Sequence, residues 1–449
     1  MKNFSAVILA AGAGTRMKSS LPKVMHKLSG KPLINWVIDA VGALKPDNIV
    51  VVLGHKSESV EESLKNKNVK IVYQKQQLGS AHALMQAQKA FKNYKGDILV
   101  MCGDVPLVKT SVLSSLLKHS KKNKSSVTVL AAKADDPYGY GRIVKSGGIL
   151  EKIAEEKDAT EQEKLIREVN SGIYCFDNNV WKALSKVKPD NAKKEYYLTD
   201  TIEILKKLGK KATSVTVGNA WELMGINDRS QLHEAEKELQ KIKIAQLFEK
   251  GVSIIDADNT YISYNAQIGQ DTVIYPGAFI DTDVKIGKGC TIQGSSYIKN
   301  SVIADNVCIL YSYINGAKIG TGSKIGPFSH IRPGSVLEEG VKVGNFSETK
   351  KTVISKNSKV NHLSYIGDAE IGENVNIGAG TITCNYDGKN KHKTVIASDA
   401  FVGSNVNFVA PVKIGKGALI AAGSTITNDI PPGKLAIARA RQELKYRKK

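Results

Sequence analysis

A glycine-rich turn followed by two basic residues forms the first candidate for chemistry in this chain. The apolar run from Ser5 to Ala11 ends in Gly12-Ala13-Gly14, and Arg16 and Lys23 follow. Glycines let backbone N–H groups approach phosphate oxygens closely, and the two cations can neutralise a triphosphate. The GKS/T ending of a P-loop and the full Rossmann spacing are both missing from the sequence. We expect a phosphate cradle here, with a plain tight turn as the alternative.

An aspartate after a buried strand is the second candidate. The apolar run 97–101 leads into Cys102-Gly103-Asp104, so Asp104 follows the carboxyl end of a predicted strand. A carboxylate at that position can hold Mg²⁺ against phosphate oxygens. A strand-capping aspartate is the alternative interpretation, and this stretch alone does not separate the two.

His362 is the third candidate, because Lys350 and Tyr365 lie near it in the sequence. Imidazole titrates in the range that suits a general base, so His362 is a candidate proton acceptor. A lone histidine is more often structural. Its position in a break of a repeat, described next, favours a chemical role.

The second half of the chain carries a strict six-residue repeat. Isoleucine occupies every sixth position from 262 to 298, and apolar residues keep the same beat over 319–343 and 396–426. A period of six matches neither a helix nor a single strand, so it predicts short strands joined by similar turns, a parallel β-helix. Many of these residues precede a glycine, as in Ile268-Gly269 and Ile377-Gly378, and we expect these glycines to relieve the corners. The repeat breaks between Val343 and Ile366 and between Ile377 and Ile396, and we expect loops at both breaks.

The first half alternates between strand-like and helix-like segments. Strands are expected at 5–11, 48–54, 69–73 and 97–101, and helices at 33–44, 57–65 and after Gly79-Ser80. This alternation predicts a parallel sheet with helices on both faces, in which ligands bind beyond the carboxyl ends of the strands.

Two further helices and the domain boundaries follow from local signals. Thr199 or Asp200 is a plausible N-cap for a helix that continues to Leu208. An amphipathic stretch over 232–250 follows Asp228 and Gln231, which resemble a capping box. We predict three parts: a first domain over 1–228, a linker helix over 229–250 and a repeat domain over 251–449.

Composition narrows the classes of function. The net charge is +21, but no basic stripe interleaves with aromatic residues, so we expect phosphorylated small molecules as partners and no nucleic acid. The five cysteines show no CxxC spacing, which fits a cytoplasmic protein without a zinc site or a disulfide framework. No stretch has the ~18 to 20 apolar residues that cross a bilayer, so we expect no membrane insertion.

Several motifs together resemble a known family. LAAGAGTRM, LPKVMH, QQLGSAHA, CGDVPL, YGYGRI, VNSGIY and ELMGIN are similar to the sugar-nucleotide pyrophosphorylases. With the repeat half and its run GNFSETKK and KVNHLSYIGDAEIGENVNIGAGTITCNYDGKNKHKT, the whole chain resembles the bacterial bifunctional N-acetylglucosamine-1-phosphate uridyltransferase / glucosamine-1-phosphate N-acetyltransferase family. The resemblance implies an α/β Rossmann-like nucleotidyltransferase domain followed by a left-handed parallel β-helix of hexapeptide repeats.

For the first half, the resemblance implies transfer of UMP from UTP to N-acetylglucosamine 1-phosphate. Arg16 and Lys23 would act on the triphosphate, and Asp104 and Asn227 would bind Mg²⁺, with Mn²⁺ as a possible substitute. The remaining nucleotide and sugar contacts implied are Leu9, Ala10, Ala11, Gly12, Gln74, Gly79, Ser80, Gly141, Glu155 and Asn170. The chain departs from the usual pattern at Ser80, where threonine is usual, and at Cys102, where an aromatic residue is common.

For the second half, the resemblance implies acetylation of glucosamine 1-phosphate by acetyl-CoA, with His362 as the base. The sugar phosphate would be held by Arg332, Lys350, Tyr365 and Asn376, and acetyl-CoA by Ala379, Asn385, Tyr386, Ser404, Ala422 and Arg439. The basic tail that begins at Arg439 would then serve the phosphates of coenzyme A, while its last residues, up to Lys448 and Lys449, can equally be a solvated end. The family forms homotrimers through the β-helix and makes UDP-N-acetylglucosamine for cell-wall synthesis.

Two other functions remain open on the sequence. One is a glucose-1-phosphate nucleotidyltransferase with a regulatory β-helix, and the other is a non-catalytic scaffold subunit. The presence of Lys350, His362, Asn385 and Tyr386 argues against the first. The joint presence of Arg16, Lys23, Asp104 and His362 argues against the second.

Overall fold

The computed structural model describes residues 3–12, 14–54, 57–217 and 220–447, and it divides into two compact units, 1–236 and 237–449. Ala13 of the glycine-rich turn and the terminal Lys448 and Lys449 lie outside the described residues. Within the described residues, no helix has the length and apolar character needed to cross a membrane.

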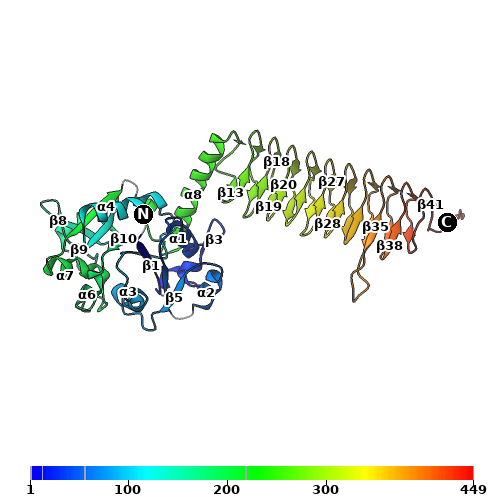
Figure 1. Cartoon of the computed structure of the whole chain (residues 1–449). Coiled ribbons are helices and arrows are strands. Elements are labelled where there is room, and N and C mark those ends of the chain that lie inside the picture. The colour runs from blue at the N-terminus through cyan, green and yellow to red at the C-terminus, as the bar shows by residue number, and fades with distance from the viewer. Residues whose placement is uncertain (1–2, 13, 55–56, 218–219, 448–449) are drawn as a thin grey trace. The chain divides into compact units, whose positions relative to one another are not determined.

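The first unit is built on one sheet in the strand order β11-β7-β10-β6-β1-β4-β5 (Figure 1). These strands are β1 (Phe4–Ala10), β4 (Ile49–Leu53), β5 (Lys70–Tyr73), β6 (Asp97–Cys102), β7 (Val127–Lys133), β10 (Glu168–Phe176) and β11 (Ala212–Val217). Neighbours are parallel except for β10, which runs antiparallel to β6 and β7. A hairpin of β8 (Arg142–Ser146) and β9 (Ile149–Ala154) attaches to β10, and a short pair, β2 (Lys27–Leu28) and β3 (Lys31–Pro32), stands apart.

Helices cover both faces of this sheet, because side chains on each strand alternate between two apolar clusters. Ala6 and Ile8 of β1 join one cluster and Val7 joins the other. The first cluster packs α1 (Leu33–Gly42), α2 (Glu58–Leu64) and α4 (Thr110–Asn123). The second packs α3 (Ser80–Ala87), α6 (Asn179–Leu184) and α7 (Thr201–Lys207), while α5 (Glu161–Lys164) buries no side chain. The expected α/β layering is confirmed.

Two expected helix caps differ in the structure. Asp200 precedes α7 but makes no side-chain capping bond, and the Thr199 hydroxyl donates to Glu155 instead. For α8 (Arg229–Glu249), Asp228 Oδ1 accepts from the backbone N–H of Gln231 at 2.9 Å. The Gln231 side chain accepts from the backbone N–H of Asn227 at 2.7 Å, one residue before the position that a capping box uses. The capping-box expectation was therefore only half right.

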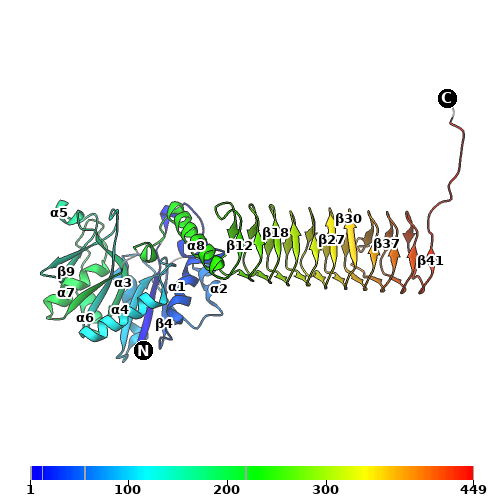
Figure 2. The same cartoon turned by 90° about the horizontal axis from the view of Figure 1, so that it is seen from above.

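The second unit is a left-handed parallel β-helix whose coils stack from β12 (Ser253–Ile254) to β41 (Leu435–Ala436) (Figure 2). Paired strands are three places apart in the chain, except for the last pair, β39 with β41, so successive strands fall on three different sheets. The other two sheets begin at β13 (Tyr261–Ile262) and β14 (Gln267–Ile268). The inward side chains stack in register, as Ile274 does on Ile292 and Ile292 on Ile309. Burial of each such side chain stabilises the fold by about 1.5 to 3 kcal/mol.

The glycines after the repeat positions have a different role from the one expected. Gly269 and Gly378 do not take positive φ; a Cβ on Gly378 would lie 2.4 Å from the backbone of Gly403 in the next coil. The left-handed corner positions are instead occupied by residues such as Asp271 (φ 61°) and Asn306 (φ 58°). Glycine is therefore required there by the close approach of neighbouring coils, and the corner explanation was wrong for these positions.

The two breaks in the repeat are different in kind. Between Val343 and Ile366 the coils continue without a loop, because Thr349 takes an inward position and the next step, to Ile354, is five residues. The strands there are β27 (Lys342–Asn345), β28 (Glu348–Lys350), β29 (Val353–Ile354), β30 (Lys359–His362) and β31 (Tyr365–Gly367). The expected loop is confirmed only at the second break, where the chain leaves the coils between β34 (Ile382–Cys384) and β35 (Thr394–Ile396) (Figure 1).

Candidate functional sites

The first candidate site is a cavity of about 410 Å³ beyond the carboxyl ends of β1 and β6. Nine residues singled out in the sequence line it together: Leu9, Ala10, Ala11, Gly12, Lys23, Gln74, Gly79, Ser80 and Asp104. Thr15, Gln77 and Glu195 also line it and were missed, although Gln77 stands inside the QQLGSAHA run. This edge is where a parallel sheet is expected to bind its ligand.

The loop before α3 is shaped by a glycine that no other residue can replace without strain. Gly79 has φ of 113°, and a Cβ there would lie 2.5 Å from the carbonyl oxygen of Tyr196. Its own carbonyl accepts from Gln74 Nε2 at 3.0 Å. Gln77 Nε2 donates to the carbonyl of Ala11 at 2.6 Å, which ties this loop to the glycine-rich turn. The side wall of the cavity is therefore held in place before any ligand binds.

Two cations and two side-chain oxygens that can bind them meet beside this cavity. Lys23 Nζ contacts the Asp104 carboxylate and lies 3.1 Å from Asn227 Oδ1, and Arg16 Nη2 donates to the same Asn227 oxygen at 2.9 Å. The backbone N–H of Ile226 donates to the carbonyl of Asp104 at 2.9 Å, which places Asn227 beside Asp104 although the two are far apart in sequence.

The oxygens of Asp104 and Asn227 fit a magnesium ion. Mg²⁺ prefers hard oxygen ligands and commonly takes only one or two from the protein, with water and phosphate oxygens supplying the rest. Among the described residues there is no cluster of three or more His, Cys, Asp or Glu side chains that could cage a metal. A carboxylate and an amide oxygen beside a phosphate cradle match this pattern.

A second cavity of about 410 Å³ adjoins the strand β10 and includes Tyr140, Asn170 and Leu223 in its lining. Gly141 lies next to it: the backbone N–H of Asn170 donates to the carbonyl of Gly141 at 2.8 Å. A Cβ on Gly141 would lie 3.7 Å from the Glu155 carboxyl carbon. The structure thus brings Gly141, Glu155 and Asn170 together, as the sequence suggested.

The polar groups at this second cavity are oriented by neighbours. Asn170 Nδ2 donates to Tyr174 Oη at 2.7 Å, and its Oδ1 accepts from the backbone N–H of Gly172 at 3.0 Å. Glu155 accepts from Thr199 Oγ1 at 3.1 Å, and burial raises the pKa of this carboxyl. In the first cavity, burial raises the pKa of the Cys102 thiol to about 12, so Cys102 acts as a small neutral side chain there.

In the second unit, His362 ends β30 and is exposed. Its Nδ1 lies 2.6 Å from Asn345 Oδ1, and the two residues are register partners on β27 and β30. With Nδ1–H donating to the amide oxygen, Nε2 is left as the free acceptor of the ring. Asn345 was missed because only the stacking of coils brings it to His362.

Arg332, Lys350 and Tyr365 lie on one neighbouring sheet. Arg332 Nη1 donates to Glu348 Oε1 at 2.7 Å, and Glu348 is the register partner of Tyr365. Lys350 Nζ lies 3.8 Å from Asp368 Oδ2. Lys350 lies on β28, Tyr365 lies on β31 and Arg332 directly follows β25 (His330–Ile331). These three strands are neighbours in one sheet, so the side chains share an outer face.

Asn376 does not join that face. It begins β33 (Asn376–Ile377), which pairs with β30 in the sheet that also carries His362. The outward Asn376 is the register partner of Lys359 and Phe401, not of Tyr365. The structure therefore splits the expected sugar-phosphate residues between two faces of one chain.

Four of the residues expected to contact acetyl-CoA, Ala379, Ser404, Ala422 and Arg439, form a line along successive coils. The carbonyl of Ala379 accepts from Asn405, that of Ser404 from Gly423 and that of Ala422 from Arg439 Nη1, at 2.7, 2.8 and 2.7 Å. In the loop before β35, Asn385 Nδ2 donates to Asp368, while Tyr386 is 59% exposed. The loop also carries Lys391, whose pKa is lowered by the nearby Lys350.

Family models match three regions of the chain. The nucleotidyl transferase model covers residues 5–241, the GMPPB C-terminal domain model covers 257–346, and the bacterial transferase hexapeptide model of six repeats covers 393–428.

Relatives match nearly the whole chain. The bifunctional protein GlmU of Halalkalibacterium halodurans is 48% identical over 444 residues, with 98% of this chain and 97% of the relative covered. That of Thermoanaerobacter pseudethanolicus is 50% identical over 445 residues, covering 98% and 96%, and that of Geotalea uraniireducens is 48% identical over 446 residues, covering 98% of each. A solved UDP-glucose pyrophosphorylase in complex with UDP-glucose is 20% identical with a TM-score of 0.44, covering 54% of this chain and 100% of that chain.

Proposed function

Because the chain belongs to the family of the bifunctional protein GlmU, we infer that it is an enzyme with two transferase activities. It acetylates glucosamine 1-phosphate from acetyl-CoA and transfers UMP from UTP to the resulting N-acetylglucosamine 1-phosphate. The products are UDP-N-acetylglucosamine, a precursor of the cell wall, and pyrophosphate. The observation that carries this conclusion is that a nucleotidyltransferase unit and a hexapeptide unit each gather their own set of polar side chains.

In the first unit, the sugar phosphate attacks the α-phosphorus of UTP and pyrophosphate leaves. Such a step needs positioning and charge neutralisation more than covalent help from the protein. We assign Leu9, Ala10, Ala11 and Gly12 to the nucleotide, and Gln74, Gly79 and Ser80 to the uracil; their joint lining of one cavity supports this assignment. Gly141, Glu155 and Asn170 hold the N-acetylglucosamine phosphate.

Asp104 and Asn227 would hold Mg²⁺, or Mn²⁺ in its place, and the bound ion would add positive charge beside the phosphates. Lys23 contacts the Asp104 carboxylate and Arg16 donates to Asn227 Oδ1, so both cations stand beside the residues that would hold the ion. Lys23 and Arg16 thus serve as the charge-neutralising residues of the uridyl transfer.

In the second unit, the amine of glucosamine 1-phosphate attacks the thioester carbonyl and coenzyme A leaves as the thiol. His362 Nε2 takes the amine proton and returns a proton to the leaving sulfur. Arg332 and Lys350 face the phosphate, and Tyr365 and Asn376 complete the sugar site. Acetyl-CoA lies along Ala379, Asn385, Tyr386, Ser404, Ala422 and Arg439, and the line that these coils form supports this path.

We propose that the protein is a cytoplasmic homotrimer through the β-helix. The separation of Asn376 from Tyr365 supports a site completed by a neighbouring subunit. A row of apolar residues at the corners of the coils is exposed to solvent in the single chain. Its members are Tyr311, Phe328, Phe346 and Leu363, which are 50, 55, 58 and 64% exposed. Phe328 and Phe346 stack with ring centroids 5.5 Å apart. Exposed contiguous apolar side chains of this kind typically mark an interface.

The test is mass spectrometry of the products formed from glucosamine 1-phosphate, acetyl-CoA, UTP and Mg²⁺, with each component left out in turn. N-acetylglucosamine 1-phosphate should accumulate without UTP, and UDP-N-acetylglucosamine should need all four. Asp104→Ala should abolish uridyl transfer and spare acetylation, and His362→Ala should do the reverse. Nucleotide transfer to a supplied sugar phosphate without any acetylation would leave a nucleotidyltransferase with a non-catalytic β-helix.

A further inference from the structure

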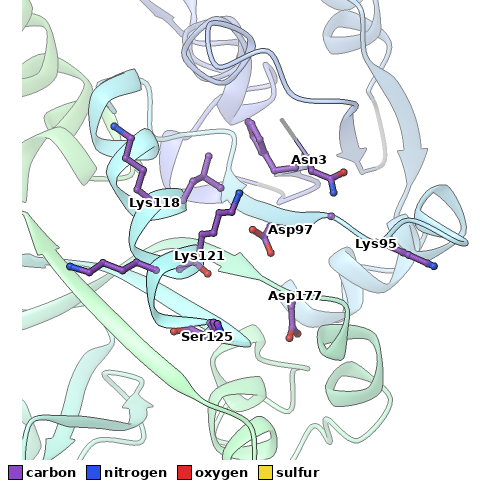
Figure 3. Close-up of a pocket in the computed structure, with 13 residues that line it drawn as sticks. Asn3, Lys95, Asp97, Lys118, Lys121, Ser125 and Asp177 are labelled. Atoms are coloured by element: carbon purple, nitrogen blue, oxygen red, sulfur yellow. The ribbon is translucent and has the colours of Figure 1, made fainter. Parts of the chain in front are cut away.

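The first unit holds a larger cavity at the opposite edge of its sheet. It measures about 670 Å³ and is lined by the starts of β1 and β6, by the C-terminal half of α4 and by the end of β10 (Figure 3). The UTP cavity lies at the other end of β1 and β6. Since β6 runs from Asp97 to Cys102, its rise of about 3.3 Å per residue separates the two edges by roughly 17 Å. The volume is typical of sites for small ligands.

The floor of this cavity contains two carboxylates with different surroundings. Asp177 is fully engaged: it accepts from Ser126 Oγ at 2.8 Å, from Asn179 Nδ2 at 2.7 Å and from the backbone N–H of Asn179 at 2.8 Å. Asp97 is half-buried and makes no side-chain hydrogen bond or ion pair with any residue that the structure describes. Its pKa is raised by burial and by Asp177 beside it, while the nearby Lys121 ammonium acts in the opposite direction. Asp97 therefore offers the cavity an acceptor that makes no hydrogen bond within the described residues.

The rim of the cavity is strongly basic. Five lysines line it, and none forms an ion pair within the described part of the chain: Lys95, Lys118, Lys121, Lys122 and Lys124. Lys118, Lys121 and Lys122 lie three and four residues apart on α4, so they share one side of that helix. Figure 3 shows Lys121 alongside Asp97, while Lys118 and Lys95 extend outward from the cavity. Elsewhere in this unit several lysines are paired, as Lys145 is with Glu168 and Lys206 with Glu151.

We propose that this cavity is a second binding site, for a small phosphate ester that also carries an ammonium group. The phosphate binds the lysines of the rim, and the ammonium donates to Asp97 on the floor. An ionised carboxylate and a cationic donor form a stronger hydrogen bond than a carboxylate and a hydroxyl, which selects the ammonium over a neutral sugar. The site is separate from both transferase sites, so the proposal stands whether or not the assigned activities are correct.

The experiment is hydrogen exchange of the full-length protein with three probes: glucosamine 6-phosphate, glucose 6-phosphate and inorganic phosphate. Glucosamine 6-phosphate should slow exchange in the segments 95–98 and 117–126. This local readout separates binding here from binding near the glycine-rich turn or His362. Glucose 6-phosphate and inorganic phosphate should protect the same segments at concentrations about tenfold higher, because they lack the ammonium.

Two variants test the two halves of the site. Lys118→Gln with Lys121→Gln should weaken protection by all three probes about tenfold or more, since two charge-assisted contacts to phosphate are lost. Asp97→Asn should remove the preference for glucosamine 6-phosphate over glucose 6-phosphate and leave phosphate binding in place. The matched control is Lys318→Gln with Lys324→Gln, which removes the same charge from exposed strands of the β-helix.

Each outcome decides the proposal. Protection by no probe at millimolar concentration, or equal protection in the wild type and the Lys118/Lys121 variant, would overturn the site. Equal protection by the amino sugar phosphate and by inorganic phosphate would overturn the role of Asp97 and its ammonium ligand. Loss of protection in the Lys318/Lys324 control would show a general charge effect and would also refute the proposal.

Discussion

The hydrogen bond from His362 to Asn345 should make a measurable contribution to acetyl transfer. When His362 takes the amine proton, its ring becomes positive while Nδ1 still faces Asn345 Oδ1 at 2.6 Å. A hydrogen bond from a neutral donor is worth about 0.5 to 1.5 kcal/mol, and one from a charged donor about 1.5 to 3 kcal/mol. The difference of about 1.2 kcal/mol appears only as the proton moves, so Asn345→Ala should lower kcat for acetylation by about eightfold.

The assay is release of the coenzyme A thiol at saturating substrates, with uridyl transfer measured on the same samples. Asn361→Ala is the matched control, because it alters the residue next to His362 without touching the Nδ1 contact. Asn361→Ala should leave kcat for acetylation unchanged. An unchanged kcat in Asn345→Ala, or an equal loss in Asn361→Ala, would refute the positioning role.

Three other predictions follow from the structure. Deleting 439–449 should raise KM for acetyl-CoA, because Arg439 anchors the tail to Ala422, whereas deleting 446–449 should leave KM unchanged; equal effects would contradict the assignment. Burial and nearby carboxylates raise the pKa of Asp200 to about 6 in the folded protein. The ionised carboxylate therefore lowers the free energy of unfolding once the pH rises through about 6. Asp200→Asn should raise Tm at pH 8 but not at pH 4. After allowance for solvent screening the gain is about 1 kcal/mol, or roughly 2 to 4 °C, checked by calorimetry at both pH values. Gly378→Ala forces a Cβ to 2.4 Å from the next coil and should destabilise the β-helix by about 1 to 3 kcal/mol or more. Gly417→Ala meets nothing within 4 Å and should cost about 1 kcal/mol because of the positive φ at that position. Denaturant unfolding of the two variants compares these losses of stability.

The nucleotide site was predictable because its residues follow the ends of strands. Leu9 to Gly12 and Asp104 end neighbouring parallel strands, and a parallel sheet puts such ends at one edge. Asn227 could be assigned only by resemblance. It lies beside Asp104 because the backbone N–H of Ile226 donates to the carbonyl of Asp104, and no sequence pattern predicts that hydrogen bond. The antiparallel direction of β10 could not be predicted either, because the residue pattern of a buried strand does not depend on its direction.

The cavity beneath α4, in contrast, could not be predicted from the sequence. Lys118, Lys121 and Lys122 have the spacing of an ordinary solvated helix face, and Asp97 begins an ordinary buried strand. That they line one cavity depends on how α4 returns to β7 over the amino ends of β1 and β6. Local patterns describe a helix or a strand, but they do not describe the space left between them.

In the β-helix, residues that lie about one coil apart in the sequence are neighbours on the same face. Arg332, Glu348 and Tyr365 lie 16 and 17 residues apart, about one coil, and therefore share a face, whereas Asn376 is offset by less than a coil and falls on the next face. The same counting brings Asn345 to His362 and lines up Ser404, Ala422 and Arg439. Asn376 is the register partner of Lys359, which starts β30, whereas His362 ends β30 and Tyr365 starts β31. Asn376 therefore lies at the other end of its face from the corner between His362 and Tyr365. If Asn376 contacts the same sugar phosphate as Tyr365, we expect it to do so from another copy of the chain.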